Sequence, residues 1–274
     1  QKKCDMYPIL LEFGQFSIKS FGLMAAIGFL LAYLVLTRTS MKIAKIPPID
    51  ISQFLVTVML GGAFGARFAY VAEHWTKEFA GMPFWEIFRF DKGGLMFYGG
   101  LGGAIIAIAL YSHIKRKSLI SLLDMSAVAL PLGHAFGRIG CFLNGCCYGR
   151  VTDSPVGLCY PTGSNPWYDQ INARLITQAA GKSLPVIPSQ LVEAALNIIL
   201  FIVLFKLAKK ERPLGFYSGI YLISYAFIRA FTETLRADPR MTVGALSIAQ
   251  FICIFVFLAG IAFLLYSRLG KKVQ

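Results

Sequence analysis

The sequence predicts an all-α integral membrane protein with about seven transmembrane helices and a small extracytoplasmic head. Hydrophobic residues make up 56% of the 274 residues, only 15% are charged, and the mean hydropathy is positive. Soluble domains of this size rarely have that composition. A bilayer core about 30 Å thick requires roughly 20 apolar residues per helix. The apolar segments of about that length are 20–37, 51–72, 93–112, 119–138, 189–207, 214–233 and 244–266.

The positive charges predict the orientation of these helices. A net charge of +13 would suggest a nucleic-acid partner for a soluble chain. Here the Lys and Arg residues cluster in short loops at helix ends, where they set topology and meet anionic lipids. We therefore expect no nucleic-acid partner, and we place 38–50, 113–118, 206–213 and the C-terminus in the cytoplasm. The N-terminus is then outside, and the first helix, which lacks a cleavage site, remains as an anchor.

The segments between the helices predict a single membrane domain, 1–274, without internal repeats. Residues 1–19 are too short to span and suit an arm at the outer interface. Residues 73–92 mix aromatic and charged side chains, which indicates either an interfacial segment or an ordinary loop. Residues 139–188 are rich in Gly, Pro, Asn and Tyr and are expected to form the extracytoplasmic head between helices four and five.

Glycine is concentrated inside two of the predicted helices. The runs are Gly61-Gly62-Ala63-Phe64-Gly65 and Gly99-Gly100-Leu101-Gly102-Gly103. Small residues four apart let helix backbones approach closely in lipid. The pattern therefore predicts helix packing.

Charged and polar side chains gather in the outer half of the predicted helices. They are Arg67, Tyr98, Arg138, Gln190, Glu193, Arg229 and Glu233. A charge inside the membrane costs at least about 2.5 kcal/mol and usually faces a cavity or another charge, although a single arginine can also snorkel to the head groups. Tyr225, Arg229, Glu233 and Arg236 follow helical spacing, so Arg229 can pair with Glu233.

Three arginines from different helices in one leaflet suit an anionic ligand. Guanidinium groups bind phosphate oxygens in a bidentate manner, and a lipid phosphate is the anion available at that depth. A proton pump would require acidic residues along the whole span, and the inner half of the predicted spans contains only Asp124. The same asymmetry disfavours an ion channel.

Several motifs resemble those of one family of membrane enzymes. The stretch Gly137-Arg138-Ile139-Gly140, with Phe142, Asn144-Gly145 and Gly149-Arg150, resembles the signature of prolipoprotein diacylglyceryl transferases, which lipidate bacterial lipoprotein precursors. Further similar motifs are Phe97-Tyr98-Gly99-Gly100-Leu101, Gly65-Ala66-Arg67, Pro188-Ser189-Gln190-Leu191 with Glu193, and Tyr225 with Arg229, Glu233 and Arg236. They cover most of the chain and occur in the family's order.

The resemblance implies a reaction in the bacterial cytoplasmic membrane, at a site that faces the outer leaflet. The lipid substrate is phosphatidylglycerol, and the acceptor is the lipobox cysteine of a prolipoprotein signal peptide. Transfer of the diacylglyceryl group to sulfur forms a thioether and releases glycerol phosphate. The enzyme must stabilise the departing anion and help to remove the thiol proton. No metal or organic cofactor is implied.

The resemblance also implies roles for individual residues. Arg138 and Arg229 are expected to hold the phosphate, with Glu233 orienting Arg229 and Tyr98 at the position of the proton acceptor. The expected catalytic residues are therefore Tyr98, Arg138, Arg229 and Glu233. The expected substrate-binding residues are Arg67, Gly99, Asn144, Gly149, Gln190, Glu193, Tyr225 and Arg236.

Four positions depart from the commonest pattern of the family. Tyr98 stands where many members have a histidine, and a tyrosine with a pKa near 10 needs activation to act as a base. Cys141 replaces an asparagine, Cys146 a glutamate and Phe21 a tyrosine. The arginines are retained, so an alternative is a non-catalytic or altered-substrate paralogue that binds phospholipid or lipoprotein.

The cysteines leave three alternatives open. Cys141, Cys146, Cys147 and Cys159 crowd one predicted outward-facing region, whereas Cys4 and Cys253 lie apart. They could form a thiol-redox centre, although no Cys-x-x-Cys pair is present, or bind zinc together with His134, although the spacing is unlike that of a zinc finger. A structural disulfide that braces the head is a further possibility in an oxidising compartment.

Overall fold

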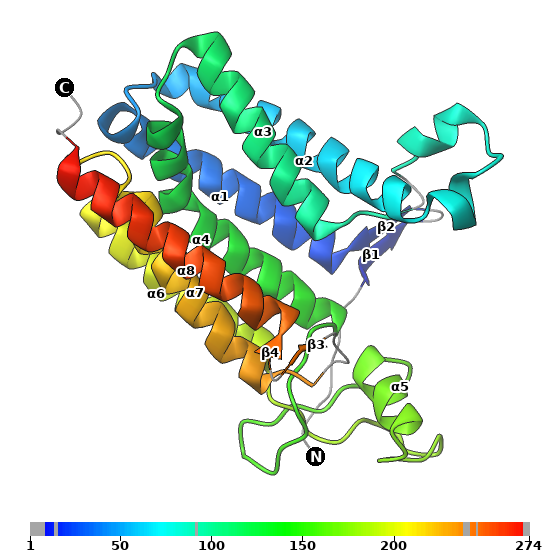
Figure 1. The fold of residues 1–274 in the computed structure, drawn as a ribbon. Coiled ribbons are helices and arrows are strands. Elements are labelled where there is room, and N and C mark those ends of the chain that lie inside the picture. Colours follow the sequence, from blue (N-terminus) through cyan, green and yellow to red (C-terminus); the bar gives the residue numbers. More distant parts are fainter. Residues whose placement is uncertain (1–8, 14–15, 91–92, 238–241, 245, 271–274) are drawn as a thin grey trace. The chain divides into compact units, whose positions relative to one another are not determined.

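The fold is described from a computed structural model, which covers residues 9–13, 16–90, 93–237, 242–244 and 246–270 (Figure 1). Cys4 and the extreme C-terminus lie outside these residues. The strands are β1 (Ile9–Phe13), β2 (Phe16–Lys19), β3 (Thr242–Val243) and β4 (Leu246–Ser247). The helices are α1 (Ser20–Ile43), α2 (Ile51–Glu73), α3 (Phe97–Lys115), α4 (Leu119–Asn144), α5 (Asn165–Asn172), α6 (Ser189–Leu207), α7 (Phe216–Leu235) and α8 (Ile248–Leu269). Short helical turns are η1 (Pro48–Asp50), η2 (Trp75–Phe79) and η3 (Phe84–Phe88).

The helices confirm the predicted fold class, an all-α membrane protein. Within the described residues, six helical segments are long and apolar enough to cross a membrane. They are Ser20–Ile43, Pro48–Glu73, Phe97–Lys115, Leu119–Asn144, Ser189–Leu207 and Ile248–Leu269. Helix α7 fills the remaining predicted segment but is less apolar, since it contains Arg229 and Glu233 among several tyrosines.

Helix boundaries differ from the apolar segments where polar or glycine residues continue a helix. Helix α4 runs past Arg138 to Asn144, so the first part of the signature stretch is helical. Helix α3 begins at Phe97, after the two glycines at positive φ, Gly93 and Gly94. Apolar composition finds where a helix can sit in lipid, but it does not mark where the backbone hydrogen bonds stop.

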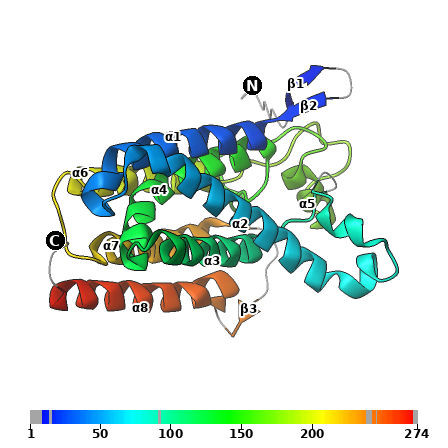
Figure 2. The ribbon, with the colours of Figure 1, turned by 90° about the horizontal axis from the view of Figure 1, so that it is seen from above.

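The structure divides into two compact units, residues 36–126 and residues 1–35 with 127–274. In the first, α2 and α3 run side by side (Figure 2). A Cβ added to Gly103 would lie 2.1 Å from the Gly61 carbonyl oxygen, and one added to Gly99 would lie 2.5 Å from the Gly65 carbonyl oxygen. Only glycine permits this approach, which confirms the predicted packing role of both glycine runs.

In the second unit, α7 lies between α6 and α8 and packs against both. Gly219 and Gly260 let α7 and α8 approach, because a Cβ on Gly219 would lie 3.0 Å from the Gly260 carbonyl oxygen. Helix α8 starts at a capping box, in which the Ser247 side chain accepts from the Gln250 amide. Between α4 and α6 the chain forms α5 and several isolated β-bridges around buried Tyr148, Tyr160 and Val186.

Candidate functional site

An ion-pair network joins α4 to α6. Arg138 Nη2 lies 3.1 Å from Glu193 Oε1, and Arg138 Nε donates to His134 Nε2 at 3.2 Å. The same carboxylate oxygen lies 3.3 Å from His134 Nε2. Glu193 is almost fully buried and Arg138 is only 14% exposed. The arginine of the signature stretch therefore has a protein carboxylate as its partner, which its position in the sequence does not reveal.

A second ion pair lies on α7. Arg229 Nη2 lies 2.8 Å from Glu233 Oε2, as the spacing of four predicts. The other terminal nitrogen of this guanidinium, Nη1, is buried and has no hydrogen-bond partner among the described residues. A buried donor without an acceptor is costly. The Arg229 Nη1 group could therefore donate a hydrogen bond to an anionic ligand.

Tyr225 connects the two ion pairs in space. Its ring lies 5.5 Å from the ring of His134 on α4, and it stands one helical turn before Arg229 on α7. The ring of Tyr221 stacks on it at 5.8 Å. Two arginines, two glutamates, His134 and Tyr225 thus form one polar cluster among α4, α6 and α7, and we call these six residues the polar cluster.

The polar cluster brings together five of the predicted site residues and one that the prediction missed. The five are Arg138, Glu193, Tyr225, Arg229 and Glu233. His134 was considered only as a zinc ligand, although it lies four residues before Arg138 on the same helix and therefore on the same face. That spacing was the signal that could have identified it.

Arg67 has a different environment, in the unit formed by residues 36–126. Its Nε donates to the Ile87 carbonyl at 2.7 Å, and its Nη2 donates to the Glu86 carbonyl at 2.9 Å. Its Nη1 donates to the carbonyls of Gly93 and Gly94 at 2.8 and 3.3 Å. All three nitrogens therefore hold the segment after α2, and the guanidinium also lies over the Tyr70 and Phe79 rings. In this structure Arg67 is a buried brace.

Tyr98 and Gly99 open helix α3. The Tyr98 side chain is exposed and contacts the Phe97 ring edge-on. Gly99 faces α2, where a Cβ would lie 2.3 Å from that of Ala69. Gly99 thus serves helix packing, and Tyr98 lies at the surface of its unit.

The remaining predicted residues surround the end of α4. Gln190 Nε2 donates to the Cys146 carbonyl at 2.7 Å and to the Tyr160 hydroxyl at 3.3 Å. Burial raises the pKa of that hydroxyl to about 12, so it stays neutral. Gly149 packs closely between the backbones of Ile187 and Leu235. A Cβ at this position would lie 2.6 Å from the Ile187 carbonyl oxygen and 2.8 Å from the Leu235 carbonyl oxygen. Asn144 ends α4, and Arg236 pairs its backbone with Gly149.

The cysteines of this region are free thiols rather than the disulfide considered above. Cys141, Cys146, Cys147 and Cys159 are all unbridged. Three of them gather, because the sulfurs of Cys141, Cys146 and Cys147 all lie within 4.8 Å of one another. Among the described residues, neither His134 nor Cys159 joins this group. The pKa of the Cys147 thiol is lowered by hydrogen bonds with the Cys141 and Cys146 thiols and by the charges of Arg236 and Arg138.

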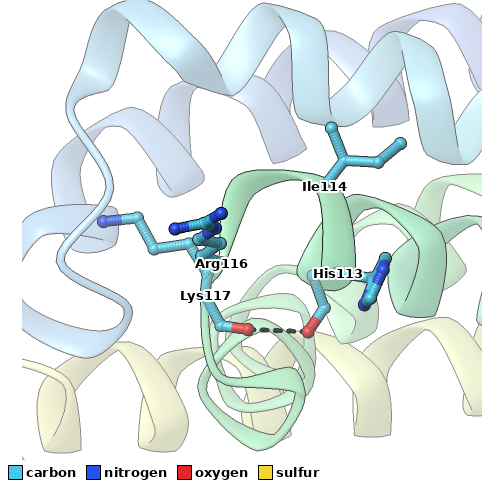
Figure 3. A pocket seen from close by; sticks show the side chains of 5 residues that line it. His113, Ile114, Arg116 and Lys117 are labelled. Carbon is cyan, nitrogen blue, oxygen red and sulfur yellow. Dashed lines mark hydrogen bonds between the residues drawn. The ribbon is translucent and has the colours of Figure 1, made fainter.

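A surface hollow lies at the C-terminal end of α3 (Figure 3). It is lined by Ser112, His113, Ile114, Arg116 and Lys117. The Ser112 hydroxyl donates to the Lys117 carbonyl at 2.6 Å, across the turn in which Arg116 takes a positive φ. The hollow belongs to the helix cap and contains none of the predicted site residues.

Comparisons with known proteins agree with the motifs. The family model described as prolipoprotein diacylglyceryl transferase matches residues 8–266. A phosphatidylglycerol–prolipoprotein diacylglyceryl transferase of Cupriavidus necator is 32% identical over 95% of this chain and 92% of its own length. Enzymes of the same name from Paraburkholderia phymatum and Clostridium tetani are each 30% identical over 97% of this chain, and over 95% and 100% of their own lengths. The chain belongs to the prolipoprotein diacylglyceryl transferase family.

Proposed function

We propose that this protein transfers the diacylglyceryl group of phosphatidylglycerol to the lipobox cysteine thiol of a prolipoprotein. The supporting structural observation is the polar cluster, where Arg229 has a buried nitrogen without a partner among the described residues. A lipid phosphate oxygen would satisfy this donor. The names of the relatives, which cover nearly the whole chain, support phosphatidylglycerol as the lipid and a prolipoprotein as the acceptor protein.

The proposed reaction is a displacement at a glyceryl carbon. The thiol sulfur forms a bond to that carbon, the bond from the carbon to the phosphate ester oxygen breaks, and glycerol phosphate leaves with the electron pair. Negative charge therefore grows on the phosphate. Arg138 and Arg229 are placed to stabilise it, since preorganised charges in a water-poor site lower such barriers. Glu233, 2.8 Å from Arg229, keeps that guanidinium in place.

The charge balance of the polar cluster suits this role. Arg138 and Glu193 form one pair, and Arg229 and Glu233 form the other, so the two guanidiniums do not stand as isolated charges in a buried site. Guanidinium groups have five N–H donors and can serve a carboxylate and a phosphate together. The lipid phosphate would then add to pairs that already exist.

The proton of the acceptor thiol requires a base. Tyr98 stands at the position that the family resemblance gives to this base, and it is exposed on its unit. His134 is a second candidate within the polar cluster, because its Nε2 lies against both Arg138 and Glu193. The pH dependence of turnover in the Tyr98→Phe and His134→Phe variants distinguishes the two candidates. The base is the residue whose replacement abolishes that pH dependence.

We further propose that the N-terminus lies outside, the C-terminus in the cytoplasm and the polar cluster toward the outer leaflet. The extracytoplasmic head would then start after the end of α4 and comprise residues 145–188. One contact supports a common side for two of the basic connections. Lys117 Nζ donates to the Lys45 carbonyl at 3.0 Å, so the connections before α2 and before α4 meet at one end of their unit. The positive-inside rule places that end in the cytoplasm.

The decisive experiment incubates the purified protein in detergent with phosphatidylglycerol and a lipobox peptide. We expect a diacylglyceryl thioether, and we expect Arg138→Ala to abolish it. Arg268→Ala is the matched control, because Arg268 is exposed near the end of α8. Lipid binding without thioether formation in the unchanged protein would refute the transferase proposal and favour a non-catalytic paralogue.

A further inference from the structure

The end of helix α4 brings two cysteines together by a defined backbone motif. Gly145 has φ of 69°, the left-handed conformation that ends many helices. The Gly145 amide donates to the Phe142 carbonyl at 3.1 Å, and the Cys146 amide donates to the Cys141 carbonyl at 3.1 Å. These two bonds define a Schellman motif, in which the second residue past the helix end packs against the third residue from the end. In most helices that contact is hydrophobic, whereas here both residues are cysteine.

Cys147 completes the group by a second turn of the backbone. It has φ of 62°, which is rare for a residue with a side chain, and its sulfur joins those of Cys141 and Cys146 within 4.8 Å. Helix α6 fixes this turn, because Ser189 Oγ donates to the Cys147 carbonyl at 2.9 Å and Gln190 donates to that of Cys146. The backbone of the three cysteines is therefore held by hydrogen bonds that do not involve sulfur, and the Cys146 thiol in addition donates to the Cys141 carbonyl at 3.7 Å.

We propose that Cys141, Cys146 and Cys147 form a three-sulfur site for a single thiophilic metal ion, with Cu(I) as its occupant. Thiolates are soft ligands that select Cu(I) and zinc. A structural zinc site is almost always four-coordinate, whereas the described residues place no fourth His, Cys, Asp or Glu ligand atom in this group. Three sulfurs without a fourth ligand suit a three-coordinate monovalent ion.

The surrounding charges suit the complex that would form. Binding replaces three thiol protons by one Cu(I), so the metal–thiolate group carries a net charge of minus two, and no electron is transferred. The guanidinium groups of Arg138 and Arg236 act electrostatically on the Cys147 sulfur and offset part of this negative charge, although Arg138 also pairs with Glu193. A partly buried anionic centre is stable only with such compensation. This inference does not depend on the proposed transferase activity.

The test is a competition for Cu(I). The full-length protein, purified in detergent and reduced under anaerobic conditions, is titrated into Cu(I) held by bicinchoninate, whose colour reports the ion that remains on the chelator. We expect the protein to withdraw one equivalent. Cys141→Ser, Cys146→Ser and Cys147→Ser should each weaken binding by more than about 10-fold, because even loss of an outer-shell partner costs 10- to 100-fold. Cys159→Ser is the matched control, since its thiol lies outside the group.

Thermal unfolding of each variant in the same detergent separates loss of a ligand from loss of the fold. Ser189→Ala, which removes a brace without touching a sulfur, should weaken binding by a smaller factor. The proposal is overturned if the unchanged protein withdraws no more Cu(I) than the triple serine variant. A disulfide between any two of the three cysteines in the isolated protein also overturns it, as does tight zinc binding that Cu(I) cannot displace.

Discussion

Arg138 on α4 and Glu193 on α6 are paired at 3.1 Å, with the carboxylate almost fully buried. The pair joins two helices that are far apart in the sequence, and His134 contacts both members. A buried ion pair contributes little net stability when intact, but its disruption leaves an uncompensated charge. Arg138 therefore depends on Glu193 for its position before any lipid arrives.

Replacement of Glu193 by glutamine should destabilise the protein. The substitution keeps the shape of the side chain but leaves Arg138 without its counter-charge, and removing one partner of a buried pair typically costs about 3–5 kcal/mol. The free energy of unfolding should therefore fall in a titration with SDS in mixed micelles. Asp153→Asn, which removes an exposed carboxylate, should leave it unchanged. Equal stability of both variants would mean that the pair does not form.

Replacement of Arg229 by lysine should reduce turnover more than lipid binding. Lysine keeps the charge but cannot contact Glu233 and a phosphate with separate nitrogens of one planar group. We expect kcat to fall by about 100-fold, the cost of losing one preorganised donor in other enzymes, with a smaller change in KM for the lipid. Arg268→Lys serves as the control. A variant with normal kcat would remove Arg229 from the chemistry.

Replacement of Arg67 by lysine should loosen the segment after α2. A lysine has one nitrogen where the arginine uses three, which hold the carbonyls of Glu86, Ile87, Gly93 and Gly94. Trypsin should therefore cut after Arg89 faster than in the unchanged protein. The affinity of the Arg67→Lys variant for phosphatidylglycerol should stay close to that of the unchanged protein. If instead lipid affinity falls while proteolysis does not change, Arg67 binds the phosphate and is not primarily a brace.

Two adjacent glycines of α3, Gly102 and Gly103, should differ in their tolerance to alanine. A Cβ on Gly103 would lie 2.1 Å from the Gly61 carbonyl oxygen, and overpacking of this kind costs about 1–3 kcal/mol. Gly103→Ala should lower the free energy of unfolding. Gly102→Ala should not, because nothing lies within 4 Å of its Cβ position and alanine favours a helix. Similar stability in both variants would contradict the close packing of α2 and α3.

The sequence predicts the helices well and their partners poorly. Apolar length is a local property, so the long helices could be placed from composition alone. The Arg229–Glu233 pair was predictable for the same reason, since both residues lie on one helix. The Arg138–Glu193 pair was not, because it depends on how α4 and α6 pack. The carbonyl partners of Arg67 were equally hidden, because backbone acceptors leave no pattern in the sequence.

The cysteines are an intermediate case. Spacing alone suggested a disulfide, a redox centre or zinc, and the structure has free thiols with three sulfurs together. The group depends on Gly145, whose left-handed conformation turns Cys146 back toward Cys141. A glycine just past a helix end was visible in the sequence, but α4 was expected to end before it. The cysteine group could not be predicted because the sequence did not show that α4 continues to Asn144.

The glycine contact between α2 and α3 restricts where a lipid can enter. Backbone meets backbone at Gly61 with Gly103 and at Gly65 with Gly99, so an acyl chain cannot enter between the two helices at these levels. A lipid chain that packs against the unit of residues 36–126 must therefore lie on the outer faces of α2 and α3 at these two levels. The two helices thus meet the lipid there as one continuous ridge and not as two separate rods.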